Sequence, residues 1–188
     1  MGIDKIKKPA VFLDRDGTIV KQVDELTDPS QLELFPGAAA AIAELDRRGF
    51  LVIVLTNQPI VEKGLLSPEG LENIHDALRA MLGAAGARLD GVYTCPHRYR
   101  AEGQCACRKP GLGLIEQAQK DFDIDMTRSW CVGDRLRDME TGRRAHIKTI
   151  LVRSGGESDD DKFFPDAKFD HVTATLGDAV RIIEGERG

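Results

Sequence analysis

Residues 10–18, AVFLDRDGT, decide the fold of this chain. The run Val11–Leu13, which can start at Ala10, is short, apolar throughout and ends at an acidic residue, a pattern that predicts a fully buried strand. The residues that follow, Asp16-Gly17-Thr18, favour a turn. Two carboxylates therefore flank the end of a buried strand, and Gly17 would let the chain bend there and approach a ligand closely.

Outward from this strand, predicted strands and helices alternate along the chain. The other apolar, strand-sized runs are Phe50–Leu55, Val92–Thr94, Trp130–Val132 and Thr149–Val152. Helical patterns cover Ala38–Arg48, a segment from the N-cap Ser67 to about Leu82, Leu112–Phe122, Asp138–Arg144 and Leu176–Glu184. This alternation predicts parallel βαβ units in a doubly wound α/β sheet, and residues 1–188 contain no repeat or linker that would mark a second domain.

The bulk composition is that of an ordinary globular domain. The 188 residues are 41% hydrophobic and 30% charged, with a formal net charge of −5, which disfavours nucleic-acid binding through a basic surface. The longest apolar run, Phe50–Leu55, is too short to span a membrane, and the N-terminus has no signal-peptide core. We therefore expect a cytoplasmic monomer without a membrane or nucleic-acid partner.

Three of the predicted strands end in polar residues. Asp14-x-Asp16 follows the first strand, Thr56-Asn57 the second and Gly133-Asp134 the fourth. Since ligands of open α/β sheets bind at the carboxyl ends of the strands, these distant segments can share one crevice. Each segment also has a plain structural explanation, because aspartate and glycine favour turns and polar side chains at strand ends often cap the backbone.

The polar residues match the needs of phosphomonoester hydrolysis, which requires a nucleophile, a proton donor for the leaving oxygen and neutralisation of the phosphoryl charge. Asp14 and Asp16 can supply the first two, and a divalent cation would reduce their mutual repulsion. Asp134 can be a third carboxylate of a magnesium site. The pair Arg108-Lys109 can bind phosphate, although a solvated basic pair would look the same in the sequence.

Taken in order along the chain, these segments resemble the four motifs of the haloacid dehalogenase (HAD) superfamily. The matching segments span residues 11 to about 153: Asp14-Arg15-Asp16-Gly17-Thr18, Thr56-Asn57-Gln58, Lys109-Pro110, and Gly133-Asp134 with Asp138. The resemblance implies a three-layer, Rossmann-like fold around a central parallel sheet. It also implies catalysis through a phosphorylated aspartate, with Asp14 as the nucleophile and Asp16 as the general acid and base.

The same resemblance assigns the binding residues. Thr56 and Lys109 would bind the phosphoryl group, and Mg²⁺ would be held by Asp14, the backbone carbonyl of Asp16, and Asp134. Further candidates for substrate binding are Asn57, Arg108 and Arg135, the last because it adjoins Asp134 and could balance its charge. Asp138, four residues beyond Asp134, could support the metal site or only lie near a helix N-terminus.

Three cysteines and a histidine cluster in a polar loop of about residues 95–107. Cys95-Pro96-His97 and Cys105-Ala106-Cys107 together offer three thiolates and an imidazole, a complete tetrahedral shell for structural zinc. The alternative is a set of unrelated reduced cysteines. A loop this polar has little core to order it, so zinc would fix the position of Arg108-Lys109, which follow directly.

The segment from Cys95 to Pro110 resembles one small branch of the superfamily, whose members have a zinc loop and no large cap domain. The branch includes phosphatases of D-glycero-D-manno-heptose 1,7-bisphosphate, an intermediate of lipopolysaccharide synthesis, and of histidinol phosphate. Only about 18 residues separate Thr18 from Pro36-Gly37, too few for an inserted cap. The resemblance implies a small phosphorylated substrate, and we expect removal of the C7 phosphate of the heptose.

Two departures from the heptose branch keep alternatives open. Pro59-Ile60 stands where Ser-Gly is usual, and Gly111–Leu114 stands where Pro-Gly-Met is usual, a segment closer to the histidinol-phosphate enzymes. We expect both segments to lie on the substrate side. An inactive, zinc-stabilised binding protein is the alternative from another class, which the intact pair Asp14 and Asp16 disfavours. The acidic run Asp159–Asp161 lacks the spacing of a calcium loop and is expected to be a solvated turn.

Overall fold

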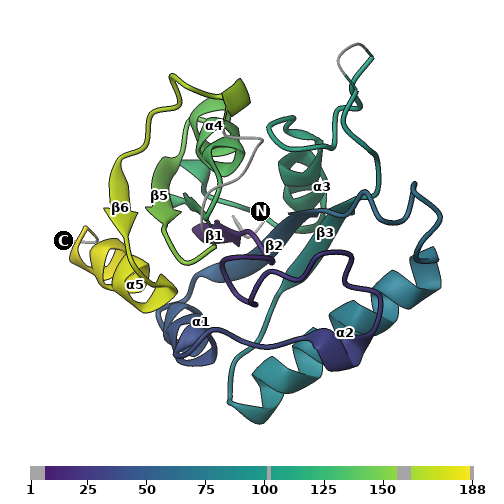
Figure 1. Cartoon of the computed structure of the whole chain (residues 1–188). Helices are drawn as coiled ribbons and strands as arrows, with labels where there is room; N and C mark the ends of the chain where they lie inside the picture. Colours follow the sequence, from purple (N-terminus) through teal and green to yellow (C-terminus); the bar gives the residue numbers. More distant parts are fainter. Residues whose placement is uncertain (1–6, 101–102, 156–161, 187–188) are drawn as a thin grey trace, which may run out of the picture.

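The computed structural model describes residues 7–100, 103–155 and 162–186, and the turn expected at Asp159–Asp161 lies outside these ranges. The described residues form one sheet of six parallel strands in the order β3-β2-β1-β4-β5-β6 (Figure 1). The strands are β1 (Ala10–Leu13), β2 (Leu51–Asn57), β3 (Gly91–Cys95), β4 (Trp130–Gly133), β5 (Lys148–Val152) and β6 (His171–Thr173). The predicted doubly wound α/β sheet is therefore confirmed.

Helices cover both faces of the sheet and make three layers. Two 3-10 turns, η1 (Pro29–Gln31) and η2 (Met126–Arg128), accompany the helices α1 (Ala38–Arg47), α2 (Pro68–Ala84), α3 (Gly113–Asp121), α4 (Leu136–Arg144) and α5 (Leu176–Gly185). One face of β1, with Val11 and Leu13, packs against α1, α2 and α5, and the other face packs against α3. Because neighbouring side chains of a strand point to opposite faces, β1 is apolar throughout and fully buried.

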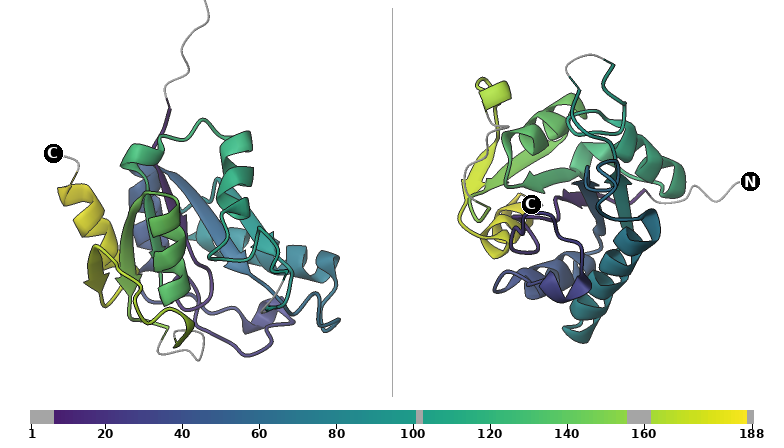
Figure 2. Two further views of the ribbon diagram at one scale, coloured as in Figure 1. Left: turned by 90° about the horizontal axis from the view of Figure 1, so that it is seen from above. Right: turned by 45° about the vertical axis from the view of Figure 1, so that its right-hand side comes forward.

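The strand order reverses between β1 and β4, which are neighbours in the sheet although β2 and β3 lie between them in the chain. At such a switch point a crevice opens at the carboxyl ends of the strands. Asp14 follows β1 and Asp134 follows β4, so both stand at this point. Figure 2 (left) shows the loops that follow β1 and β5 gathered at the same end of the sheet.

Two elements differ from the sequence-based expectation. Helix α4 begins at Leu136 rather than Asp138, because the Asp138 carboxylate accepts a hydrogen bond from the backbone N–H of Arg135 (3.1 Å) and caps the first turn. Strand β6 was not predicted, since its three residues include no apolar run. His171, the first residue of this edge strand, has its Nε2 2.6 Å from Glu186 Oε1.

The connection from β1 to α1 has the short form that the spacing predicts. Residues 14–37 contain the 3-10 turn η1 and isolated bridges between Asp16 and Val20 and between Val20 and Leu34, and they carry no inserted domain. No helix in the described part of the chain is long and apolar enough to cross a membrane. That residues 1–188 form a single domain stays a prediction.

Candidate active site

Asp14 lies in the crevice at the switch point, where the sheet fixes its backbone. Its N–H donates to the carbonyl of Val132 in the neighbouring strand (3.0 Å). Its carboxylate Oδ1 accepts from the N–H of Arg15 (2.7 Å) and lies 3.0 Å from Lys109 Nζ. A carboxylate held at a strand end beside a buried cation is well placed to attack an electron-poor phosphorus.

Lys109 reaches Asp14 from the chain that follows the cysteine loop. Its ammonium is buried between Asp14 and Asp138, 2.6 Å from Oδ1 of the latter. Burial alone would lower the pKa of Lys109, but the negative charges of Asp138 and Asp14 raise it above its usual range. The lysine therefore stays charged and can neutralise a phosphoryl oxygen.

Asn57, at the end of β2, positions Lys109. Its side-chain carbonyl accepts from the N–H of Lys109 (3.0 Å), and its amide N–H donates to the carbonyl of Lys109 (3.3 Å). These two bonds hold the lysine backbone from both sides. The expected contact of Asn57 with the substrate stays a prediction, because the bonds that the structure shows lead to Lys109.

Three buried aspartates form a cluster that fits a magnesium ion. Oxygens of Asp14, Asp134 and Asp138 all lie within 4.8 Å of one another. Within the described residues neither carboxylate oxygen of Asp134 accepts a hydrogen bond, although Arg135 Nε lies 2.9 Å from Oδ2. Burial and the charges of Asp14 and Asp138 raise the pKa of Asp134 to about 8. Carboxylate oxygens that repel one another are hard ligands of the kind that Mg²⁺ prefers, and the bound ion would relieve their repulsion.

The backbone leaves room for the Asp134 carboxylate only because two positions lack a side chain. A methyl group at Gly17 would lie 2.2 Å from Asp134 Oδ2, and one at Gly155 would lie 1.8 Å from the same atom. Gly17 also has a φ of +82°, which other residues adopt at a cost. Gly17 in the first motif must therefore remain a glycine, because the Asp134 carboxylate of the last motif occupies the space beside it.

Asp16 is held apart from the three clustered carboxylates. The fully buried Arg15 forms an ion pair with the Asp16 carboxylate, with Nη2 2.9 Å from Oδ2. Gln58 Nε2 donates a hydrogen bond to the same oxygen (2.7 Å). Gln58 also donates to the hydroxyl of Thr56 (2.8 Å), which links the expected proton donor to the expected phosphoryl ligand. Arg15 and Gln58 belong to the sequence motifs, but the sequence alone indicated no role for their side chains.

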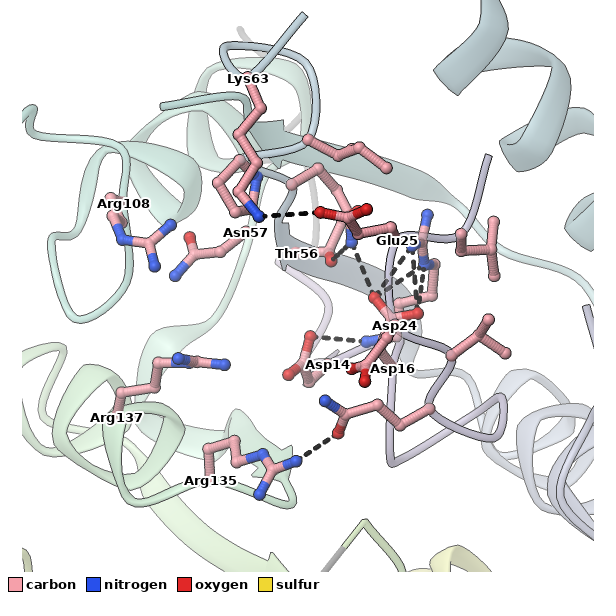
Figure 3. A pocket seen from close by; sticks show the side chains of 17 residues that line it. Asp14, Asp16, Asp24, Glu25, Thr56, Asn57, Lys63, Arg108, Arg135 and Arg137 are labelled. Carbon is pink, nitrogen blue, oxygen red and sulfur yellow. Dashed lines mark hydrogen bonds and ion pairs between the residues drawn. The ribbon is translucent and has the colours of Figure 1, made fainter. Parts of the chain in front are cut away.

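A cleft of about 270 Å³ opens over Asp14 and Asp16 and is strongly basic on one side. Figure 3 shows Arg108, Arg135 and Arg137 along that side. Arg135 Nη2 donates to the carbonyl of Gly155 (3.3 Å) and also bonds to Gln22. Burial and the nearby positive charge of Arg137 lower the pKa of Arg108. Like charges gathered at one wall of a cleft favour an anion between them.

Arg137 and Lys63 line the cleft but were not among the predicted site residues. Arg137 lies two residues after Arg135 in the sequence, and this spacing was the signal for its place in the cleft. The signal was not recognised because the helix was expected to begin only at Asp138, whereas α4 begins at Leu136. Lys63 lies 3.3 Å from Glu25, so these two charged residues of different loops meet at the rim. Spacing along the chain could not predict that meeting.

The two departures from the heptose branch have different surroundings. Pro59 and Ile60 line the cleft, as expected. The expectation that Gly111–Leu114 faces the substrate is wrong, because this segment packs beneath the cysteine loop. A methyl group at Gly111 would lie 2.2 Å from the carbonyl oxygen of Ala106, so glycine is needed there for close packing.

The predicted zinc ligands converge in space. One donor atom from each of Cys95, His97, Cys105 and Cys107 lies within 4.8 Å of the others. The sulfur of Cys95 is 3.5 Å from that of Cys105 and 3.1 Å from that of Cys107, close to the roughly 3.8 Å edge of a tetrahedral zinc–thiolate site. Arg108 Nη1 donates to the carbonyl of His97 (3.0 Å), so the loop also holds the first arginine of the basic wall.

The fold and the carboxylate cluster define a hydrolase of the HAD class, and known proteins agree. The HAD-hydrolase-like family model matches residues 106–179. The D-glycero-beta-D-manno-heptose-1,7-bisphosphate 7-phosphatase of Pasteurella multocida is 33% identical over 183 residues, covering 95% of this chain and 98% of the relative. The enzyme of the same name from Rhodopseudomonas palustris is 38% identical over 148 residues, or 75% of this chain and 81% of the relative.

A solved structure gives the same result. The D,D-heptose 1,7-bisphosphate phosphatase of B. bronchiseptica, complexed with magnesium and phosphate, superposes with a TM-score of 0.81 at 28% identity and covers 95% of this chain and 99% of its own. The chain belongs to the heptose-1,7-bisphosphate 7-phosphatase family within the HAD superfamily.

Proposed function

We propose that this chain is a magnesium-dependent phosphatase that removes the C7 phosphate of D-glycero-β-D-manno-heptose 1,7-bisphosphate. The observation that carries the proposal is the position of Asp14, whose carboxylate stands at the switch point 3.0 Å from Lys109 Nζ. The relatives described above are named for this substrate, and they favour it over histidinol phosphate.

In the first step Asp14 attacks the phosphorus and the bond to the sugar oxygen breaks. Asp16 gives its proton to that leaving oxygen, and Arg15 and Gln58 hold the Asp16 carboxyl in place for the transfer. Lys109 and the hydroxyl of Thr56 bind phosphoryl oxygens. Asp14, Asp134 and the backbone carbonyl of Asp16 would hold magnesium, which would supply positive charge to neutralise the phosphoryl oxygens.

In the second step water releases phosphate from the phosphorylated Asp14. Asp16, now ionised, accepts a proton from the water as it attacks phosphorus, and the bond between phosphorus and the Asp14 oxygen breaks. Asp14 is thus the nucleophile of the first step and the leaving group of the second, and Asp16 makes both proton transfers. The buried ammonium of Lys109 balances the charge that returns to Asp14.

The second phosphate of the substrate has a natural partner in the basic wall. Arg108 and Arg137 line the cleft and carry charges that no catalytic step requires. A bidentate arginine matches a phosphate well. Histidinol phosphate has one phosphate only and would leave this wall without an anion.

The test is turnover of a substrate panel by the wild-type chain and by Asp14→Asn. With Mg²⁺ present we expect the heptose bisphosphate to give the highest kcat/KM, and Asp14→Asn to lose about a thousandfold or more of it. Asp76→Asn, an exposed change on α2, is the matched control and should be as active as the wild type. Preference for histidinol phosphate would overturn the substrate, and an inactive wild type would favour the zinc-stabilised binding protein.

The remaining expectations are also part of this proposal. A cytoplasmic location, a monomeric state and the lack of nucleic-acid or membrane partners stay predictions from the sequence. Gel filtration with light scattering would test the monomer.

A further inference from the structure

Two exposed aromatic rings join loops that are far apart in the chain. Tyr99, in the cysteine loop, stacks on Phe163, in the connection after β5, with ring centroids 5.6 Å apart and planes 24° from parallel. Tyr99 is 57% and Phe163 53% exposed, so neither ring serves the hydrophobic core. Lys162 Nζ lies 5.5 Å from the centre of the Phe163 ring. Large rings that pair outside a core need another explanation.

The pair lies directly behind the basic wall of the cleft. A small cavity of about 50 Å³ is lined by both rings together with Arg108 and Arg137, the two arginines that also line the catalytic cleft. Each guanidinium side chain therefore has the substrate cleft on one side and the aromatic pair on the other. Such apolar backing keeps long, flexible arginine side chains from spreading into solvent.

The stack also completes the attachment of the cysteine loop. On one side Glu62, from the segment after β2, accepts from the N–H of Arg98 and pairs with the guanidinium of Arg100. On the other side the Tyr99–Phe163 stack ties the loop to the connection after β5. The loop in turn holds Arg108 through the carbonyl of His97. The two tethers thus hold the loop whose His97 carbonyl binds Arg108.

We propose that Tyr99 and Phe163 are positioning residues that set Arg108 and Arg137 for the phosphate distant from the reacting centre. The inference rests on the proposed function, since it requires a substrate with two phosphates. Lys109 also lines the small cavity beside the rings, but neither ring lines the cleft that holds Asp14 and Asp16, so the stack acts on the arginines and not on the two catalytic carboxylates. Selection of a bisphosphate over a small monophosphate depends on it.

The experiment compares Tyr99→Ala, Phe163→Ala and the double variant with heptose bisphosphate and with p-nitrophenyl phosphate, at saturating Mg²⁺ and Zn²⁺. We expect each single variant to raise KM for the bisphosphate about three- to tenfold, with kcat unchanged. Both constants for p-nitrophenyl phosphate should stay within about twofold of the wild type. The double variant should be no worse than either single variant, because both remove the same contact.

Matched variants separate the stack from a general effect on the loops. Tyr99→Phe and Phe163→Tyr keep both rings and should restore the wild-type KM. Phe169→Ala removes another exposed ring from the same connection and should change nothing. Melting temperatures of all variants should agree with the wild type within a few degrees, since the rings are exposed.

Three results would overturn the inference: an unchanged KM for the bisphosphate, an equal loss with both substrates, or single effects that multiply in the double variant. Failure of the proposed function is distinguishable, because it is read from the wild type. A wild type that hydrolyses p-nitrophenyl phosphate but not the bisphosphate would overturn the proposed substrate, and this inference with it.

Discussion

The carboxylate half and the arginine half of the cleft are built from different kinds of structure. Asp14 and Asp134 directly follow two neighbouring, fully buried strands, and the ladder between β1 and β4 fixes their separation. Arg108 and Arg137 come from a cysteine loop and from the first turn of a helix. Under the proposed function, the chemistry depends mainly on the sheet, while substrate selection depends on segments that the cysteine cluster, Glu62 and the aromatic pair would hold in place.

Because the two halves have different supports, substitutions should impair them separately. A change in the carboxylate half should stop turnover of every phosphate ester, because all of them need the nucleophile and the metal. A change in the arginine half should act through KM and only on substrates with a second anionic group. Substitutions in each half, metal removal and pH can each test this separation.

The largest effect is expected for Asp134→Asn. The neutral amide cannot replace a carboxylate ligand of Mg²⁺, so kcat should fall about a thousandfold for both the bisphosphate and p-nitrophenyl phosphate. The metal-free variant should nevertheless melt at a higher temperature than the metal-free wild type, because folding no longer has to protonate a carboxyl group crowded by two others. Steady-state kinetics and thermal melts without added magnesium measure the two effects. A loss confined to the bisphosphate would contradict the separation.

Zinc removal should have the second largest effect, and it should impair both the arginine half and the carboxylate half of the cleft. Because Lys109 follows Cys107 by two residues, release of the loop would displace both Arg108 and Lys109. We expect a loss of about a hundredfold in kcat/KM for the bisphosphate and a smaller loss for p-nitrophenyl phosphate. Metal analysis together with limited proteolysis at residues 95–107 should show loss of zinc and of loop order in parallel. Full activity of zinc-free protein supplied with magnesium would refute the role of the loop.

Arg137→Met should affect the arginine half alone. Loss of a charge-assisted hydrogen bond to the distant phosphate should raise KM for the bisphosphate about tenfold, and kcat should stay the same. Arg143→Met, on the exposed side of the same helix, is the control, because that arginine pairs with Glu140. An equal decrease in kcat for p-nitrophenyl phosphate would assign Arg137 to the chemical step instead.

The smallest effect is a pH dependence of stability in the metal-free protein. The pKa of Asp134 is about 8 in the folded chain, above the ordinary value of 3.8, so folding takes up a proton between these pH values. The folded state then holds more protons than the unfolded state, and the free energy of unfolding should fall as the pH rises, by at most about 1.4 kcal/mol per pH unit. Urea titrations at several pH values should show a flatter dependence for Asp134→Asn. Equal slopes would mean that other groups dominate.

How much of the molecule the sequence predicts follows the same division. The strand that ends at Asp14 and the strand that ends at Asp134 were predictable, because apolar runs and the residues after them are local signals. The four zinc ligands were predictable as a set, because two short motifs contain them all. The fold of the sheet followed from the alternation of strands and helices.

The remainder depends on contacts between segments that have no common pattern. Arg137 joined the cleft only once α4 began two residues earlier than predicted, and the grip of Arg15 and Gln58 on Asp16 depends on side-chain directions. The stack of Tyr99 on Phe163 joins residues of two irregular loops. Gly111–Leu114 was assigned to the wrong surroundings, since adjacency to Lys109 in the chain did not imply adjacency to the substrate.

The two hydrogen bonds between the Asn57 side chain and the Lys109 backbone have a practical consequence for protein engineering. An amide that both donates and accepts imitates one rung of a β-ladder, so it gives Lys109 an attachment to the end of β2 in addition to the one that the cysteine loop provides. Residues 96–106, exchanged together with their two metal-ligand candidates, can therefore serve as a cassette between relatives that keep this asparagine and the lysine. Chimaeras made in this way would carry a new preference for the distant part of a substrate on an unaltered catalytic frame.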